Sequence, residues 1–383
     1  MVSRHNRKAR RATLRIRRVI AIAAVAFIIL EFVSAGVIRF GFIEAERPSY
    51  QLPRSKPFWI DQHPHFGMWH EADTQFDDEK ICFSASYRTN AYGARDRKRI
   101  RKGKTPRVVM LGDAFTEGYG VARAERTSDI LEAETKAEHL NFGTSGHFGA
   151  TQSWLLYKHL AKGFDHDVVI FNLVPDNDFI NDDPQYADAY RSQYRPYLVL
   201  RGGNYYLKYM NPDQRGLSPE EIRAQEHRIL GRLFKNFTYA ANLVNRLANF
   251  VGEQFAGSKG SAVSTNAVYS GYFDFTQAQA ERMIYVLEQL LEEAGKRTVI
   301  VTLVPRPSDF RHLSSAPVRA VLDVLVPAYP NLHIVDFRDA FGRDENWKKY
   351  YRDCDDYWST AGSAAAAQVL LDDPVYRKAM GLD

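Results

Sequence analysis

Five short runs rich in branched apolar residues constrain the fold of this chain most. They cover residues 107–111, 139–142, 167–174, 297–304 and 332–337. Such runs are typical of strands buried on both faces of a sheet. Helical patterns separate them; one opens at Thr276, which can cap a helix, and ends at Gly295. Strands that alternate with helices predict an α/β fold, a flavodoxin-like three-layer sandwich around a central parallel sheet.

Composition excludes two classes of protein. The 383 residues are 45% hydrophobic and 13% aromatic, which is too apolar for a disordered chain. The net charge of +5 has a local origin, because eight basic residues and no acidic ones precede Val19. Without that tail the acidic residues outnumber the basic ones. We therefore expect no nucleic-acid partner.

The basic tail, residues 1–18, leads into an apolar segment at 19–43. About 20 such residues cross the hydrocarbon core of a bilayer, and positive charge keeps the preceding end in the cytoplasm. The sequence thus predicts a single-pass anchor with the main domain outside the cytoplasm. Glu31 interrupts the apolar run, because a carboxylate in a membrane is costly unless it is protonated or faces a partner helix. We interpret it as a tolerated polar residue near the outer end, with helix pairing as the alternative.

A cleaved export signal is the competing interpretation of the same segment. Val19 to Leu30 would then be the apolar core of the signal, and Val33-Ser34-Ala35 a small-residue cleavage site. Arg10-Arg11 is weakly similar to a twin-arginine signal. The anchor is favoured because largely apolar sequence continues past that site to Ile43. Both interpretations export the domain.

Residues 44–98 form an aromatic-rich leader, predicted to pack on the main domain as turns and short strands. The spacing of His63, His65 and His70, with Glu71, matches no zinc motif, so we interpret them as surface loop histidines. No metal and no cofactor are expected.

The main domain is predicted at 99–383, with an insertion at about 179–271. Within it, 197–200 and 205–207 flank a turn at 201–204 and predict a β-hairpin. Ser218 opens a helical stretch toward residue 249, and residues 256–264 have the composition of a mobile loop. The insertion leaves the carboxyl end of a strand, where open α/β sheets bind ligands. We expect it to influence the choice of substrate or partner.

The first apolar run ends in Gly112-Asp113-Ala114-Phe115-Thr116-Glu117-Gly118. This segment resembles the first block of the SGNH (GDSL-type) hydrolases, with Ala114 in place of the nucleophilic serine. Leu140-Asn141-Phe142-Gly143-Thr144-Ser145-Gly146 resembles the second block, and Gly146 matches the glycine whose N–H contacts the oxyanion. Val174-Pro175-Asp176-Asn177-Asp178 resembles the third, and Asn177 matches its amide donor. The resemblance implies an esterase architecture whose oxyanion donors are present.

Cys354-Asp355-Asp356-Tyr357-Trp358 resembles the final block of that family. Asp355 matches the aspartate that orients the catalytic histidine, and Tyr357 stands in the place of that histidine. In other members of the family the aspartate lies three residues before the histidine instead of two. With that spacing, Cys354 would stand at the position of the aspartate. A tyrosine with a pKa near 10 is a poor base at neutral pH. By this comparison the chain lacks both the nucleophile and the base. Any catalysis by replacement groups would have to use the nearby residues Thr116, Ser145 and His147.

A lead-in at 89–96 resembles that of membrane-anchored bacterial relatives, which are linked to acylation or deacylation of envelope polysaccharides. The resemblance implies a periplasmic domain held at the bacterial inner membrane. Our leading hypothesis is a pseudoenzyme that binds a glycan, an acylated ligand or a protein, with an acyltransferase or assembly protein as a possible partner. An active esterase or O-acyltransferase with a displaced nucleophile, and a structural adaptor with a plugged pocket, are the alternatives.

Two cysteines, Cys82 and Cys354, lie far apart in the sequence. In an oxidising compartment they would pair and close a long loop. Two inert buried thiols are the alternative.

Overall fold

The architecture was obtained from a computed structural model. It describes residues 2–43, 45–48, 50, 58–59, 61–80, 82–104, 106–145, 147–186, 194–210, 231, 233–255, 270–311 and 316–382. Internal contacts divide the chain into two compact units. One combines Met1–Ser55, Glu79–Ile81 and Arg223–Lys259, and the other contains the rest. The larger unit therefore includes most of the leader, whereas part of the insertion belongs to the smaller one.

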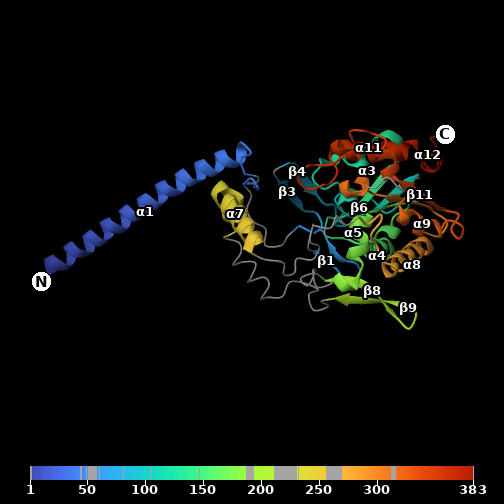
Figure 1. The fold of residues 1–383 in the computed structure, drawn as a ribbon, viewed down its shortest axis with the longest axis horizontal. Coiled ribbons are helices and arrows are strands. Elements are labelled where there is room, and N and C mark those ends of the chain that lie inside the picture. Colours follow the sequence, from blue (N-terminus) through green and yellow to red (C-terminus); the bar gives the residue numbers. More distant parts are fainter. Residues whose placement is uncertain are drawn as a thin grey trace. The chain divides into compact units, whose positions relative to one another are not determined.

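A five-stranded parallel sheet forms the centre of the larger unit (Figure 1). All five predicted strands are confirmed within about a residue at either end: β5 Arg107–Gly112, β6 Glu138–Gly143, β7 Val168–Leu173, β10 Thr298–Leu303 and β11 Leu332–Asp336. Their order across the sheet is β11-β10-β7-β5-β6. Numbered along the chain this is 2-1-3-4-5 read from β6, the flavodoxin-like order. The predicted fold class is confirmed.

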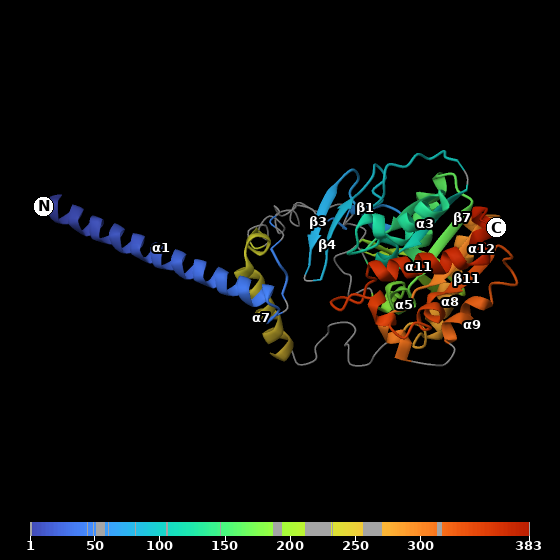
Figure 2. The ribbon, with the colours of Figure 1, turned by 90° about the horizontal axis from the view of Figure 1, so that it is seen from above.

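Alternate residues of each strand face two separate apolar cores. Val109 and Leu111 of β5 belong to one core, whereas Val108 and Met110 belong to the other. The first core is covered by α4 Ala150–His159, α8 Gln277–Ala294 and α9 Pro317–Asp323. The second is covered by α3 Thr127–Thr135, α11 Thr360–Asp372 and α12 Pro374–Met380. Helices thus lie on both faces of the sheet, which makes the three layers (Figures 1 and 2).

Local sequence explains where α8 begins and ends. The Thr276 hydroxyl accepts a hydrogen bond from the Gln279 N–H, and the Gln279 side chain accepts one from the Thr276 N–H. This reciprocal capping box satisfies two N–H groups that the first turn leaves free. Gly295, with φ of +65°, follows the last turn. Both predicted ends of this helix are confirmed.

The leader forms two short antiparallel strand pairs. The strands are β1 Asp61–His63, β2 Gly67–Trp69, β3 Gln75–Glu79 and β4 Ser84–Arg88. Phe66 and Trp69 belong to the first core of the sheet domain, as expected for a leader that packs on that domain. One expectation about the leader is wrong. His70 is not a surface residue: it is 1% exposed, because the aromatic leader covers it and Glu117 binds it.

The predicted hairpin of the insertion is also present. β8 Arg195–Arg201 pairs antiparallel with β9 Asn204–Met210 around Gly202 and Gly203, both with positive φ. The helix expected from Ser218 begins outside the described residues, which contain α7 Tyr239–Phe255. The loop expected at 256–264 lies outside them as well.

The smaller unit contains one long helix, α1 Val2–Arg39. Its segment Leu14–Arg39 is long and apolar enough to cross a membrane. The first turns of α7 pack against the end of α1, as both ribbon views show (Figures 1 and 2).

Candidate functional site

The first block lies where β5 ends and the short helix α2, Ala114–Glu117, begins. Asp113 is the N-cap of this helix, and its carboxylate accepts a hydrogen bond of 3.0 Å from the Phe115 N–H. A carboxylate at that position satisfies a free N–H and complements the helix dipole. Ala114, at the position of the nucleophile, is the first helical residue and is 3% exposed. A methyl group therefore stands at the position that the sequence comparison assigns to the nucleophile.

The second block approaches α2 closely through Gly143. A Cβ atom at this position would lie 2.2 Å from the Glu117 backbone nitrogen, so only glycine fits. The Asn141 side chain also fixes the second block against α2, because its amide donates to the Thr116 carbonyl oxygen at 2.6 Å. Gly146, the expected oxyanion donor, lies outside the described residues.

The third block meets the first through a side-chain hydrogen bond. Asn177, on α5 Pro175–Asn181, donates from Nδ2 to Oδ2 of Asp113 at 2.7 Å. Burial raises the pKa of the Asp113 carboxyl, although the hydrogen bonds from Asn177 and Phe115 oppose the shift. Burial and the nearby Asp113 also raise the pKa of Asp178. Two of the predicted site residues are thus brought together, with the amide donating to an acid.

Tyr357, at the position of the histidine, packs against the first block. Its ring centroid lies 5.2 Å from that of Phe115 and 5.2 Å from that of Tyr119. Burial, followed by the charge of Asp113, raises the pKa of Tyr357 to about 12, while Arg306 acts in the opposite direction. A phenol with this pKa keeps its proton near neutrality and cannot act as a general base.

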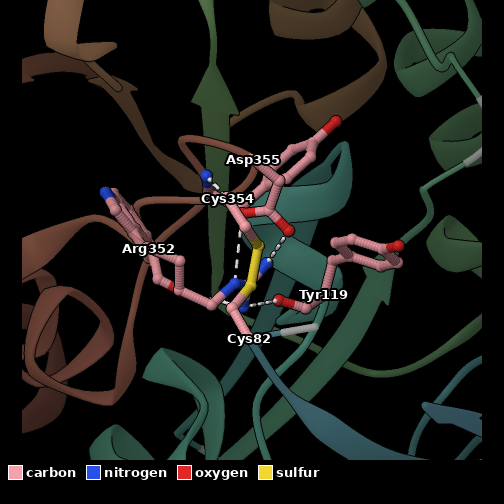
Figure 3. Close-up of a disulfide and its surroundings, with 7 residues drawn as sticks. Cys82, Tyr119, Arg352, Cys354 and Asp355 are labelled. Carbon is pink, nitrogen blue, oxygen red and sulfur yellow. Dashed lines mark hydrogen bonds and ion pairs between the residues drawn. A yellow bond between two sulfur atoms is a disulfide. The ribbon is translucent and has the colours of Figure 1, made fainter. Parts of the chain in front are cut away.

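Asp355 does not orient a base in this structure. The Arg352 guanidinium donates to both its carboxylate oxygens, at 3.1 Å from Nε and 2.9 Å from Nη2 (Figure 3). The Tyr357 N–H donates to Oδ1 at 3.1 Å. Arg352 also donates to the backbone oxygens of Tyr119 and Trp358. Asp355 therefore fixes the shape of the final block rather than tuning a catalytic group.

Cys82 and Cys354 form a disulfide (Figure 3). The bridge joins the turn between β3 and β4 of the leader to the final block, and both residues are exposed. The buried-thiol alternative therefore does not match the structure. The two sulfur atoms and an Asp355 oxygen lie within 4.8 Å of one another. Sulfurs bonded to each other are not thiolates, so these atoms do not form a zinc ligand set.

Arg306 is a charged residue of the site that the motif comparison missed. It follows β10, and its Nε lies 3.5 Å from Oδ2 of Asp176 in the third block. Its guanidinium lies 5.2 Å from the Tyr357 ring centroid and 5.7 Å from that of Phe115. The carboxyl ends of parallel strands meet at one sheet edge. That rule, applied to the fourth predicted strand, would have identified this residue.

Asp309 holds the Arg306 turn in place. Its carboxylate accepts hydrogen bonds from the Arg306 N–H, at 2.7 Å, and from the Ser270 hydroxyl. Burial raises the pKa of Asp309 to about 7, although these two hydrogen bonds lower it. This acid therefore titrates within the physiological range.

Glu117 forms a second buried cluster beside the first block. Its carboxylate accepts from the Trp59 indole N–H at 3.1 Å and from both the N–H and the hydroxyl of Ser145. Nε2 of His70 lies 3.2 Å from Oε1, and Nδ1 of His70 lies 2.9 Å from the Gly93 carbonyl oxygen. Burial raises the pKa of Glu117, but His70 and the hydrogen bonds outweigh that effect and bring it below its usual value. The carboxylate is a weak base.

The hydroxyl of Thr116 is engaged as well. It donates to the Leu111 carbonyl oxygen at 3.2 Å and accepts from the Asn172 amide at 2.8 Å. It thus ties α2 to two strands and is only 2% exposed. In the contacts described above, neither the Thr116 hydroxyl nor the Ser145 hydroxyl is hydrogen-bonded to a histidine.

No family model and no curated protein matches the sequence. Similar solved structures include a lipolytic G-D-S-L protein from Veillonella parvula: TM-score 0.38, 12% identity, covering 71% of this chain and 99% of that one. A lipase/acylhydrolase from Enterococcus faecalis has a TM-score of 0.38 and 13% identity. The match covers 73% of this chain and 97% of that one. A putative G-D-S-L lipolytic protein from Desulfitobacterium hafniense has a TM-score of 0.35 and 12% identity. The match covers 69% of this chain and 99% of that one.

The strand order and the places of the blocks define the class of fold. The sheet has the flavodoxin-like order, and the first three blocks follow β5, the edge strand β6 and the central strand β7. The fold is a flavodoxin-like α/β sandwich with the motif blocks at the carboxyl ends of its strands, on a chain with one apolar N-terminal helix.

Proposed function

We propose that this chain is a non-catalytic relative of the GDSL-type hydrolases that binds an O-acylated glycan at the former active site. The observation that carries the proposal is the state of the two reactive positions. Ala114 offers no nucleophile, and Tyr357 has a pKa of about 12 and offers no base. In the family mechanism these two groups act as a unit, so losing both removes the route to an acyl-enzyme.

The groups around these positions support binding of a polar, hydroxyl-rich ligand. Tyr357, Arg306 and Asp176 are each partly exposed at the carboxyl edge of the sheet. An aromatic ring packs against the apolar face of a sugar, while charged side chains bond its hydroxyl groups. The same edge is where ligands bind in open α/β sheets.

The proposed location follows from the N-terminal helix. Basic residues precede Val19, and the apolar segment follows them, so the positive-inside rule places the N-terminus in the cytoplasm. The domain would then lie on the periplasmic side of a bacterial inner membrane. The Cys82–Cys354 disulfide supports an oxidising compartment.

Hydrolysis of an aryl acetate by the full chain in nanodiscs tests the loss of catalysis. We expect the unmodified protein to match the buffer rate. Ala114→Ser and Tyr357→His alone should remain inactive, whereas the double variant should gain activity if the rest of the site survives. Turnover by the unmodified protein would disprove the non-catalytic proposal.

Saturation-transfer NMR tests the ligand class. We expect signals from O-acetylated oligosaccharides, weaker signals from their deacetylated forms, and loss of both in Tyr357→Ala. The matched control is Tyr206→Ala on β9, where the ring is 53% exposed. Absence of oligosaccharide binding would favour the structural adaptor instead.

A displaced nucleophile is the second candidate function, and one contact favours it. The Ser145 hydroxyl donates directly to the Glu117 carboxylate. That carboxylate has a lowered pKa, accepts from Trp59 and lies 3.2 Å from Nε2 of His70, so it takes up a proton poorly. In the same assay, aryl acetate turnover that disappears in Ser145→Ala would establish this function.

A further inference from the structure

Glu31, the carboxylate in the apolar segment of α1, binds the start of another helix. Its Oε1 accepts from the Tyr239 N–H at 2.7 Å, and its Oε2 accepts from the Ala240 N–H at 2.9 Å. These N–H groups belong to the first turn of α7 and have no partner within that helix. A carboxylate is the favoured group there because it also complements the helix dipole. Glu31 therefore acts as the cap of a helix about 200 residues away.

A second set of contacts extends this pairing along α1. The Arg39 guanidinium donates from Nε to the Tyr239 hydroxyl at 2.9 Å. Ile38 and Tyr239 form a small apolar core with Ala45, against which Leu243 packs. Ser34 is fully buried in the same unit. The last two turns of α1 and the first turn of α7 are thus joined by polar and apolar contacts.

The outward surface of α1 is apolar, whereas that of α7 is amphipathic, because Asn245 and Arg246 are exposed beside its apolar side chains. On α1, Phe32 and Val33 are 76% and 56% exposed; on α7, Val244 and Leu247 are 57% and 45% exposed. Glu31 lies eight residues before Arg39, which corresponds to about 12 Å along a helix. A hydrocarbon core of about 30 Å needs roughly 20 residues. Counted from Arg18, Glu31 falls inside that span, so whatever surrounds α1 at Glu31 also surrounds the first turns of α7.

We infer that α7 is a membrane helix, held in the outer leaflet beside α1, with Val244 and Leu247 in contact with lipid. The inference rests on the proposed anchor role of α1. It gives Glu31 a function: two charge-assisted hydrogen bonds and the helix dipole offset the cost of a carboxylate in the membrane. It also opposes a cleaved signal. Ser34 is fully buried, and cleavage after Ala35 would remove the cap of α7.

Environment-sensitive probes in vesicles test this placement. Val244→Cys and Leu247→Cys, made in the full chain in phosphatidylcholine–phosphatidylglycerol vesicles, are labelled with a nitrobenzoxadiazole maleimide without reductant. The native disulfide then stays intact. We expect blue-shifted emission and quenching by doxyl-labelled lipid at both positions. Asn204→Cys, on the exposed hairpin, is the aqueous control.

Two results would overturn the inference in different ways. If the probes on α7 respond like the probe at Asn204 while the protein resists carbonate extraction, α1 is an anchor and α7 is not embedded. If carbonate releases the protein, both the anchor and the embedded α7 are wrong. The glycan and hydrolysis assays are independent of either result.

Hydrogen exchange of the full chain in nanodiscs tests the cap itself. Glu31→Leu makes α1 more apolar, so insertion is preserved while the cap is lost. We expect the amides of Tyr239 and Ala240 to exchange about fivefold faster, as for loss of a typical N-cap. Glu281→Gln, on α8, should leave the exchange of α7 unchanged. Equal exchange of α7 in Glu31→Leu and the unmodified chain would overturn the role assigned to Glu31.

Discussion

The side-chain amide of Asn177 donates a 2.7 Å hydrogen bond to the carboxylate of Asp113. The pair joins the third block to the first and holds the amide in one orientation. The other amide atom, Oδ1, is buried without a hydrogen-bond partner in the part of the chain that the structure describes. The side-chain amide of Asn177, which the sequence comparison matches to an oxyanion donor, is therefore already hydrogen-bonded to Asp113. This arrangement stabilises the site without requiring a substrate.

Asn177→Asp places a second carboxylate within hydrogen-bond distance of Asp113. At pH 5 one proton can be shared, but at pH 8 both groups ionise and repel each other. We expect the variant to lose about 3 kcal/mol of unfolding free energy relative to wild type at pH 8, and much less at pH 5. Urea denaturation at the two pH values measures the difference. Asn204→Asp, on the exposed hairpin, is the control, and an equal loss at both pH values would contradict the shared-proton account.

Asp309 makes the stability of the sheet domain depend on pH. Its folded pKa of about 7 lies above the ordinary value of 3.8, so the folded state retains a proton that the unfolded state releases. Its contribution is therefore greatest below pH 4 and declines as pH rises toward 7, by up to about 1.4 kcal/mol per pH unit.

Asp309→Asn removes this titration. We expect a smaller fall in unfolding free energy between pH 5 and pH 8 than in wild type. At pH 5 the variant should be about as stable as wild type, because an amide, like the protonated carboxyl, offers the Arg306 N–H one accepting oxygen and the Ser270 hydroxyl one donor. Urea denaturation at several pH values gives the slope. An identical pH dependence in the two proteins would assign it to other groups.

The sheet could be predicted from the sequence because its signals are local. Strands β5 and β7 are mostly apolar runs that are buried on both faces. The helix α8 is capped by residues next to its own ends, Thr276 and Gly295. Each feature depends on residues within one element. Asp113 and Asn177 each follow a predicted strand, and the structure joins the two side chains at the carboxyl edge of the sheet.

The remaining features depend on partners distant in sequence. His70 was expected at the surface because its own segment contains no sign of Glu117, which lies 47 residues further on. Glu31 was interpreted as a tolerated polar residue, but the alternative of helix pairing is the one that matches the structure, and nothing near Glu31 identifies Tyr239 as its partner. Arg306 follows a predicted strand, but its role depends on Tyr357. Tertiary contacts between such segments leave no local pattern.

The Cys82–Cys354 disulfide closes a loop between residues separated by 272 positions. A cross-link restricts the unfolded chain, and its removal typically costs about 2–4 kcal/mol. We expect the double variant Cys82→Ser, Cys354→Ser to lose this amount in urea denaturation. A reductant should destabilise wild type equally and leave the double variant unchanged. If the unmodified protein is insensitive to reductant, the disulfide makes no contribution to stability.

Glu117 links the leader to the sheet domain through a buried charge. Its carboxylate accepts from the Trp59 indole N–H and from Ser145 and lies beside His70. Glu117→Gln keeps the shape but turns an NH2 group toward those donors. Breaking a buried pair by changing one partner typically costs about 3–5 kcal/mol. We expect a loss of this size in urea denaturation, with a change in Trp59 fluorescence.

A double-mutant cycle separates the Glu117–His70 interaction from the other contacts of the carboxylate. His70→Phe retains an aromatic ring in the leader core but removes both ring nitrogens. If the pair interacts directly, the double variant should lose less than the sum of the single losses, by about 1–3 kcal/mol. Glu134→Gln, at an exposed position on α3, controls for the loss of a carboxylate. Additive losses would mean that Glu117 stabilises the leader through Trp59 and Ser145, and that His70 is held by the Gly93 carbonyl instead.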